Sequence, residues 1–336
     1  SVDGGALKTE DLRPETLLLG NADKTRLPAQ VLARLKTREA PEAKPLRARA
    51  LLKVQDGCDL RCTYCIIPSV RGPSRSFGRE EILDRARRLI ARGFREIVIC
   101  GIHLSSYGHD LNPAGSLAGL LRSLVELEGL GRLRLSSLDP RNLDDELIGL
   151  ITGDSRICPH FHVSIQHASD RVLKLMGRRS NAAGYRRILE SLKERAPEAA
   201  LGADMIVGFP GEEEKDFERL VGFVAESPLD YLHVFTYSPR PGTPAAAWVQ
   251  IGDAEKHRRS AVLRAVAEDR RRAFRERFIG RELTGIVVRK DSPGPEVLTS
   301  NYIDVLVPSC SRAPGEEVKV RITRVDSGLT AGEEAV

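Results

Sequence analysis

Six runs of strand-forming residues alternate with helical patterns, and this alternation constrains the fold more than any other feature of the chain. The strand-like runs are 50–55, 95–100, 132–136, 161–166, 203–207 and 231–237. The intervening segments, such as 79–92 and 185–195, repeat apolar residues at helical spacing. Such alternation predicts a parallel sheet with right-handed crossovers. Six units are too few for a closed eight-fold barrel, so we predict an α/β fold with an open, partial (β/α)6 barrel; a doubly wound sheet is the alternative.

The pattern changes after this alternating region. Residues 253–281 are helical in pattern and carry ten Lys/Arg against five Asp/Glu. Residues 282–336 contain short strand-like runs at 283–289, 302–307 and 317–325, separated by glycines, which predicts a small all-β barrel. We therefore divide the chain into a leading segment with its linker, a core, a basic helical connection and a β-barrel. Their bounds are 1–46, 47–252, 253–281 and 282–336.

Composition excludes several classes of protein. The chain has six cysteines in 336 residues, too few for a disulfide scaffold, and three of them lie within eight residues, which indicates metal or cofactor chemistry in a reducing compartment. No apolar run reaches the roughly 18 residues that span a bilayer, and the first residues do not resemble a signal peptide. We expect a cytoplasmic protein that does not enter membranes.

The three clustered cysteines, Cys58, Cys62 and Cys65, have the spacing C-x3-C-x2-C and follow the first predicted strand. Thiolates are soft ligands that suit iron–sulfur clusters or zinc. Three thiolates would leave one iron of a [4Fe–4S] cluster open to chelate S-adenosylmethionine. The alternative is a zinc site with a distant fourth ligand, from Cys100, His103, Cys158 or Cys310. Zinc sites usually pair two C-x2-C halves, and the sequence holds no second half.

These residues carry a family resemblance. The motif from Gly57 to Cys65 resembles the radical S-adenosylmethionine (SAM) superfamily, and its extension through 66–72 resembles the methylthiotransferases. The segments 101–110, 204–212 and 233–245 are similar to the branch that acts on threonylcarbamoyl-adenosine in tRNA (MtaB-type). The similarity runs from about Leu18 to the C-terminus. The last domain resembles the TRAM module, a nucleic-acid-binding barrel.

The resemblance implies an enzyme, a transferase of sulfur-containing groups. It would form a 5′-deoxyadenosyl radical from SAM at a [4Fe–4S] cluster and make the 2-methylthio derivative of the adenosine beside the anticodon. The implied partners are the tRNA anticodon loop and a flavodoxin- or ferredoxin-like electron donor. The family holds a second [4Fe–4S] cluster on three cysteines of an N-terminal domain. This chain has no such trio before Cys58, so we expect residues 1–46 to be a remnant of that domain and a linker.

Further site residues follow from the resemblance and from strand ends. We expect Tyr64, Gly101, Ser137, Gln166 and Val207 to contact SAM, with ordinary turn, surface or core packing as the alternative for each. His103, His160, His162 and His167 also lie near strand ends, and we assign none of them as a general base. Cys100, Cys158 and Cys310 are isolated, which is typical of small buried residues.

Two other functions stay open. One is methylthiolation of an aspartate in a ribosomal protein, because a basic substrate would suit the acidic barrel, which has nine Asp/Glu against six Lys/Arg. The other is an RNA-binding remnant without full activity. The basic helix either contacts phosphates or presents a solvated face with balancing acids.

Overall fold

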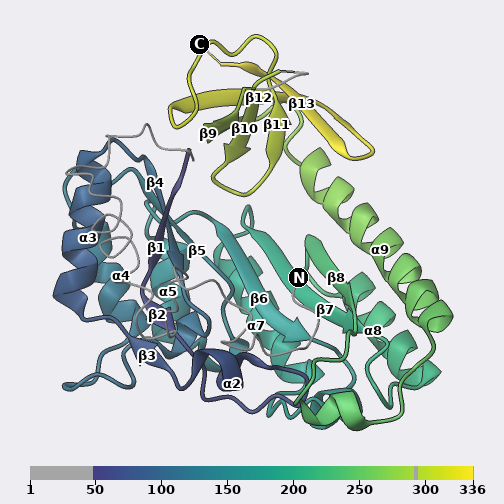
Figure 1. Ribbon diagram of the computed structural model, residues 1–336. Helices are drawn as coiled ribbons and strands as arrows, with labels where there is room; N and C mark the ends of the chain where they lie inside the picture. Colours follow the sequence, from purple (N-terminus) through teal and green to yellow (C-terminus); the bar gives the residue numbers. More distant parts are fainter. Residues whose placement is uncertain (1–47, 291–293, 336) are drawn as a thin grey trace, which may run out of the picture. The chain divides into compact units, whose positions relative to one another are not determined.

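A computed structural model describes residues 48–290 and 294–335 of the chain. Its core is a sheet of parallel strands that follow one another in chain order (Figure 1). The strands are β1 (Ala50–Lys53), β4 (Glu96–Cys100), β5 (Arg132–Leu135), β6 (His160–Gln166), β7 (Ala200–Val207) and β8 (Tyr231–Thr236). Parallel bridges from Leu133 to Ile157 and from Leu138 to Val163 join the two halves of the sheet. No ladder within the described residues joins β8 to β1, so the predicted open, partial (β/α)6 barrel is confirmed.

Helices connect successive strands and pack on one face of this sheet (Figure 1). They are α3 (Arg79–Ala91), α4 (Leu117–Val125), α5 (Asp145–Gly153), α7 (Ala182–Arg195) and α8 (Glu214–Glu226). Their N-termini are set by short polar side chains: Ser116, Asp144 and Asn181 each accept a hydrogen bond from a backbone N–H of the first turn. Short turns complete the connections, namely α2 (Ile67–Arg71), η3 (Leu104–Ser106), η4 (Pro140–Asn142), α6 (Asp170–Leu175) and η5 (Pro244–Ala247).

The two faces of the sheet differ in chemistry. On β6, Phe161, Val163 and Ile165 are buried in the apolar core shared with the helices. Because side chains alternate along a strand, His160 and His162 lie on the opposite, concave face. This concave face, which we call the lumen, is polar. It is where a parallel barrel presents its functional residues, near the C-terminal strand ends.

Residues 282–334 form a closed five-stranded barrel, as predicted. Its strands are β9 (Glu282–Arg289), β10 (Glu296–Thr299), β11 (Asp304–Leu306), β12 (Glu317–Asp326) and β13 (Leu329–Glu334), in the order β10-β11-β13-β12-β9. Two of these, β10 and β13, were not predicted. Strand β10 has four residues, and β13 reads Leu-Thr-Ala-Gly-Glu-Glu, so neither shows a clear apolar alternation.

A buried ionic cluster attaches the core to this barrel. Glu96 on β4 accepts hydrogen bonds from Arg132 Nε at 2.7 Å and from Arg134 Nε at 2.8 Å. Both guanidinium groups also donate to barrel carbonyls, including those of Leu298 at 3.2 Å and Thr299 at 3.1 Å. Burial raises the pKa of Glu96, but the two arginines outweigh burial and hold it at about 2. The carboxylate therefore stays ionised between two cations that reach across the junction.

The basic connection predicted at 253–281 contains helix α9 (Asp253–Glu276), which packs against β8 and α8. Many of its cations have partners within the chain. Arg258 and Arg259 pair with Glu214 and Glu255, and Arg270 donates to the carbonyls of Ser227 and Leu229. The leading segment, 1–46, lies outside the described residues. No helix in the described part is long and apolar enough to cross a membrane.

Candidate active site

The three clustered cysteines occupy one loop at the C-terminal end of β1. The loop runs between β2 (Gln55–Asp56) and α2, and β2 pairs with β3 (Arg75–Ser76), which closes the loop at its base. Gly57 opens the loop with a φ of +70°, and a Cβ there would lie 1.9 Å from the carbonyl oxygen of Pro73. Only glycine fits this position, so the residue before the first cysteine is fixed by the path of the backbone.

The three thiols lie in one short loop, near enough to influence one another's charge. Burial raises the pKa of Cys58, and the neighbouring Cys62 and Cys65 raise it further, while the Leu60 N–H, 3.4 Å from Sγ, works in the opposite direction. Three thiolates would repel one another here unless a cation lay between them. They are not packed as ligands of one ion: among the described residues, only His162, Asp204 and His233 bring three ligand atoms that close. A wider spacing suits a multi-iron cluster, in which each thiolate binds a different iron.

Gln55 holds this loop against the loop that follows β4, and sequence reasoning missed it. Its side chain is fully buried. Its Nε2 lies 2.8 Å from the carbonyl oxygen of Gly57 and 2.9 Å from Ser74 Oγ, and its Oε1 accepts from the backbone N–H of His103 at 2.9 Å. One amide thus spans the cysteine loop and the turn at Gly101, which the sequence assigned to SAM.

A second missed group lies beside the cysteine loop. Asp139, after β5, accepts two hydrogen bonds from Arg141 at 2.9 and 2.8 Å, and Arg178 approaches it at 3.4 Å. Burial raises the pKa of Asp139, but the two guanidinium groups outweigh it and lower the pKa. The pKa of Arg141 is raised chiefly by its hydrogen bond to Asp139, and the nearby Cys62 thiol contributes. This cationic group therefore lies next to the cysteines.

Some buried polar atoms near this group have no hydrogen-bond partner in the described structure. They are His103 Nε2, which lies 3.8 Å from Asp139, and Arg178 Nε. Ser136 Oγ, at the end of β5, is a third such atom. Buried polar atoms are costly when unpaired, so each of these calls for a partner such as a water molecule, an ion or a ligand. A zwitterionic, hydroxyl-rich molecule such as SAM could supply the missing partners.

The residues assigned to SAM from sequence have different surroundings. Gly101 follows β4, and a Cβ there would come within 3.0 Å of Gln55 Oε1. Gln166 ends β6 with a φ of +74°, a strained value for a residue other than glycine. Ser137 is exposed, and it is the neighbouring Ser136 that carries the unpartnered hydroxyl. The ring of Tyr64 packs edge-on against the ring of Phe209, with the two ring centroids 6.3 Å apart.

Val207 is fully buried and packs within the apolar core. Contact of these five residues with SAM stays a prediction. The isolated cysteines lie on separate elements, with Cys100 at the end of β4, Cys158 before β6 and Cys310 in the barrel core. Burial raises the pKa of Cys158 to about 11.

The histidines separate into two groups. His103 and His167 lie at the C-terminal ends of the strands, which form the mouth of the lumen. His167 is fully buried, and burial lowers its pKa to about 3. His160 and His162 lie deeper, in the N-terminal half of β6, where Tyr231 joins them. Of these four histidines, His103 is therefore the one that could transfer a proton at the mouth. Its pKa is lowered, mainly by burial.

Comparisons with known proteins agree with this architecture. A family model described as the radical SAM superfamily matches residues 52–224. Threonylcarbamoyladenosine tRNA methylthiotransferase MtaB of Aquifex aeolicus is 38% identical over 258 residues, which cover 76% of this chain and 62% of that protein. The tRNA-2-methylthio-N(6)-dimethylallyladenosine synthase of Cereibacter sphaeroides is 36% identical and covers 87% of this chain and 67% of its own length.

Other matches widen the range of substrates. The ribosomal protein uS12 methylthiotransferase RimO of Acetivibrio thermocellus is 44% identical over 196 residues, 58% of this chain and 43% of that protein. A solved structure of the radical SAM methyltransferase TsrM from Kitasatospora setae has a TM-score of 0.51 at 19% identity, over 59% of this chain and 38% of its own, which supports the fold alone. The chain spans between about half and two thirds of the length of the first three relatives.

Proposed function

We propose a function on one premise: the chain belongs to the radical SAM superfamily, in its methylthiotransferase family. Its loop of Cys58, Cys62 and Cys65 would hold a [4Fe–4S] cluster whose fourth iron is open to SAM. The observation that carries this proposal is the placement of three free cysteines in one loop at the C-terminal end of β1, with the other cysteines of the described residues on separate elements. When bound, the cluster supplies the electron that cleaves SAM reductively to a 5′-deoxyadenosyl radical.

The chain's own residues position and shield this chemistry. Gln55 fixes the cysteine loop relative to the turn at Gly101 and His103, so that the cluster and SAM are held in one frame. Arg178 and Ser136 offer polar atoms to the carboxylate or hydroxyls of SAM. Arg141 lies near Cys62, where a cation would offset the negative charge of the thiolate-bound cluster. Preorganised groups of this kind need no rearrangement when the cofactor binds.

We propose that the substrate is the threonylcarbamoyl-adenosine beside the anticodon of a tRNA and that the product is its 2-methylthio derivative. Support comes from the relatives named MtaB and from the motifs that resemble that branch. Unpaired anticodon-loop bases can leave their stack and enter a pocket. The polar lumen and the adjoining TRAM-like barrel would receive the loop. A flavodoxin- or ferredoxin-like protein would supply electrons, and the site of action would be the cytoplasm.

A second candidate is methylthiolation of an aspartate in ribosomal protein uS12, favoured by the 44% identity with a RimO protein. The acidic composition of the barrel would suit a basic protein. Nucleoside analysis of tRNA from a strain lacking the gene separates the two. Loss of the 2-methylthio derivative of threonylcarbamoyl-adenosine supports the tRNA substrate, whereas an unmodified uS12 aspartate with normal tRNA supports the protein substrate.

The enzyme class itself has a direct test. Anaerobic reconstitution of the chain should give about four irons, as one cubane requires. Addition of dithionite and SAM should then give 5′-deoxyadenosine. Cys62→Ala should lose the iron and this product, and Cys310→Ala, in the barrel core, is the matched control. Iron for two clusters per chain would show that the isolated cysteines bind iron as well.

A further inference from the structure

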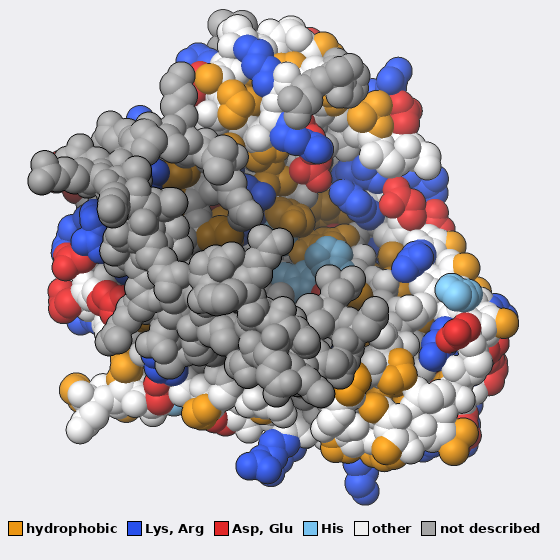
Figure 2. Space-filling view, viewed as in Figure 1, with side chains coloured by type: hydrophobic (Ala, Val, Ile, Leu, Met, Phe, Trp, Pro, Cys, Tyr) orange, Lys and Arg blue, Asp and Glu red, His pale blue; other side chains and the backbone are white. Residues whose placement is uncertain are grey.

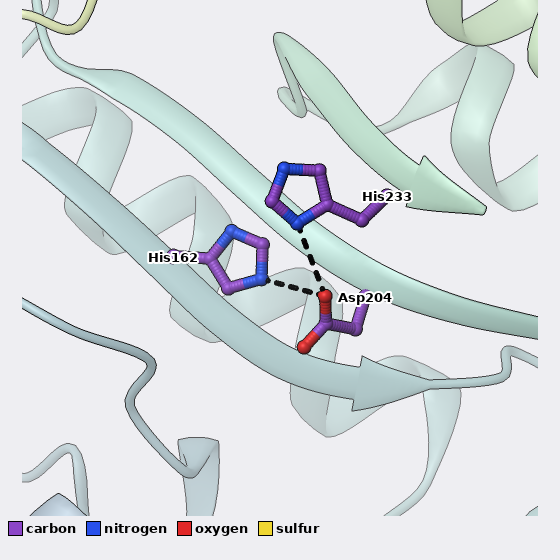
Figure 3. Close-up of side chains that lie close together, drawn as sticks. All are labelled: His162, Asp204 and His233. Atoms are coloured by element: carbon purple, nitrogen blue, oxygen red, sulfur yellow. Dashed lines mark ion pairs between the residues drawn. The ribbon is translucent and has the colours of Figure 1, made fainter. Parts of the chain in front are cut away.

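A compact group of ionisable side chains lies inside the lumen, farther from the C-terminal strand ends than the cysteine loop. The proposed function does not use it. It consists of His162 on β6, Asp204 on β7 and His233 on β8 (Figure 3). Asp204 and His233 are direct neighbours in the β7–β8 ladder, and His162 pairs with Gly202, two residues before Asp204. Three adjacent parallel strands therefore direct these side chains to one point on the same face of the sheet.

The ligand atoms of the group are close together. His162 Nε2 lies 3.0 Å and His233 Nδ1 lies 3.3 Å from Asp204 Oδ1, and all three ligand atoms lie within 4.8 Å of one another. Ligands around a divalent transition metal, at bonds of about 2.0–2.2 Å, stand about 3–3.5 Å apart. The two histidine–aspartate distances match that spacing. Hydrogen bonds without a metal also have this length, so the distances alone do not decide.

The charge around the group favours a metal ion. The other buried carboxylates facing the barrel interior are paired with arginine: Glu96 with Arg132 and Arg134, and Asp139 with Arg141 and Arg178. Asp204 has no arginine or lysine within ion-pair distance among the described residues, and its partners are the two histidines. Two neutral imidazoles and one carboxylate make a donor set with a net charge of −1. A negatively charged donor set of this kind, without a cationic side chain beside it in the described part of the chain, is suited to bind a cation.

Tyr231 prepares His162 for ligation. The tyrosine oxygen lies 2.9 Å from His162 Nδ1 and 2.6 Å from His160 Nε2. A histidine that ligates through Nε2 must carry its proton on Nδ1, and Tyr231 is placed to accept that proton in a hydrogen bond. Partners of this kind fix the tautomer and the ring orientation of metal ligands. His162 is buried, and Tyr231 is partly buried at the edge of a cavity, so the bond between them is largely shielded from solvent.

The group is also reachable from solvent. His233 is half-exposed and lines a cavity of about 530 Å³ together with Tyr231, Arg264 and Arg271. Figure 2 shows histidine side chains in a hollow on this face of the molecule. The rings of His162 and His233 are stacked, with their centroids 4.8 Å apart. Because His233 is the more exposed of the two, its ring is the one that would rotate to direct a nitrogen at an ion.

We propose that His162, Asp204 and His233 form a binding site for one divalent transition-metal ion, separate from the cysteine cluster and open toward the lumen. Two imidazoles and one carboxylate are a donor set for zinc, iron(II) or cobalt(II), whereas magnesium and calcium prefer oxygen ligands alone. Three protein ligands leave positions for water or another ligand, as in catalytic rather than structural metal sites. The site does not depend on the identity of the methylthiolation substrate.

The first test counts metal on the cluster-loaded full chain. After incubation with zinc sulfate and gel filtration, the wild type should hold one zinc per chain in addition to its iron. Asp204→Asn and His233→Ala should each lose the zinc and keep the iron. His257→Ala, which removes an exposed histidine of α9, should keep both. Retention of zinc by both site variants, or its absence from the wild type, would overturn the proposal.

The second test identifies the ligands. In the Cys58→Ala, Cys62→Ala, Cys65→Ala chain, cobalt(II) should give d–d absorption that saturates at one equivalent, without the charge-transfer bands of thiolate ligation. Adding Tyr231→Phe should weaken cobalt binding roughly 10–100-fold, as loss of an outer-shell partner does. Adding His233→Ala should weaken it further. If the triple variant does not fold, the zinc count on the cluster-loaded chain decides alone. Thiolate bands, or equal binding by all variants, would assign the metal to another site.

Discussion

Gln55 and His103 lie 48 residues apart and are joined by a single hydrogen bond of 2.9 Å from the His103 backbone N–H to the Gln55 side-chain oxygen. The other end of the same amide donates to Gly57, the residue before the first cysteine. The cysteine loop and the turn after β4 are thereby fixed to each other. We therefore expect the position of the cysteine loop relative to the turn at Gly101 to depend on this one buried side chain.

Gln55→Ala should therefore loosen the cysteine loop. The substitution leaves the carbonyl of Gly57 and the N–H of His103 without this partner, and each buried unpaired group costs about 1–3 kcal/mol. We expect fewer irons per chain after reconstitution and faster loss of iron to a chelator. Gln250→Ala is the control, because the side chain of Gln250 is exposed and bonds only to nearby carbonyls. Equal iron retention in both variants would show that the loop holds its shape without Gln55.

Gly57→Ala should be more damaging than its size suggests. The new Cβ would meet the Pro73 oxygen at 1.9 Å in a backbone conformation of positive φ, so the loop must move. We expect loss of most bound iron and a lower melting temperature. Gly222→Ala makes the same chemical change inside helix α8, where nothing lies within 4 Å of the new Cβ, and should stabilise by roughly 0.5–1 kcal/mol. Unchanged iron content in Gly57→Ala would contradict the close approach.

The lowered pKa of Glu96 predicts how the free energy of unfolding changes with pH. Its pKa lies at about 2 in the folded chain, below the ordinary value of 4.5, so ionised Glu96 stabilises the fold above pH 4.5. This contribution, on the order of 3 kcal/mol, should disappear as the pH falls from 4.5 toward 2. Denaturant unfolding of wild type and Glu96→Gln across that range measures it, and the difference between the two should shrink toward low pH.

At neutral pH, Glu96→Gln leaves Arg132 and Arg134 buried without their anion, which should cost about 3–5 kcal/mol. Glu282→Gln breaks the exposed ion pair with Arg321 at 2.6 Å and should cost about 0–1 kcal/mol. A similar small loss in both variants would mean that the barrel carbonyls alone satisfy the two arginines.

Periodicity and turn residues were enough to predict the architecture. The six strands and their parallel direction follow from the alternation of strand-like and helical patterns, and the predicted strand bounds differ by at most three residues from those observed, at the start of β7. Ala200 and Gly202 are small, so they gave no strand signal there. The three-cysteine spacing located the loop because its ligands are close in sequence.

Groups assembled from distant segments could not be predicted in this way. Asp139 and Arg178 meet only because β5 and β6 are neighbours, and the role of Gln55 depends on a loop 48 residues away. The histidine–aspartate group did leave a signal, since His162, Asp204 and His233 are polar residues within three predicted strands. Strand order and register, which the sequence does not contain, were needed to bring them together.

The structure shows which arginines of α9 can test whether this helix contacts RNA phosphates. Arg270 bonds to the carbonyls of Ser227 and Leu229, so its removal would disturb folding. Arg264 and Arg271 instead line the 530 Å³ cavity and are the better probes of phosphate contact. If both arginines contact RNA phosphates, the double variant Arg264→Ala, Arg271→Ala should bind tRNA with a flatter salt dependence. The slope of the logarithm of the binding constant against the logarithm of the salt concentration should fall by about 1–2, since each phosphate contact contributes roughly 0.7–0.9. Arg87→Ala, on the exposed face of α3, is the control, and an unchanged slope assigns α9 to a solvated face.

The last prediction concerns how much of the reaction this 336-residue chain performs alone. Reductive cleavage of SAM needs only the cluster at Cys58, Cys62 and Cys65. Sulfur insertion needs a sulfur source beside the substrate, and the family resemblance places that source on a second cluster held by three further cysteines. Here the remaining thiols, Cys100 and two others, lie on separate elements, and a cubane needs converging thiolates.

We therefore expect 5′-deoxyadenosine but no methylthiolated nucleoside when the chain is supplied with SAM, dithionite, sulfide and threonylcarbamoyl-adenosine tRNA. Fusing a family N-terminal domain that carries the three cysteines to the chain should restore the product, and the same fusion with those cysteines changed to alanine should not. Mass spectrometry of the digested tRNA decides between the outcomes. Methylthiolated nucleoside formed over several turnovers by the chain alone would mean that sulfur reaches the lumen without a second cluster. The histidine–aspartate site would then be the first place to look for the group that binds it.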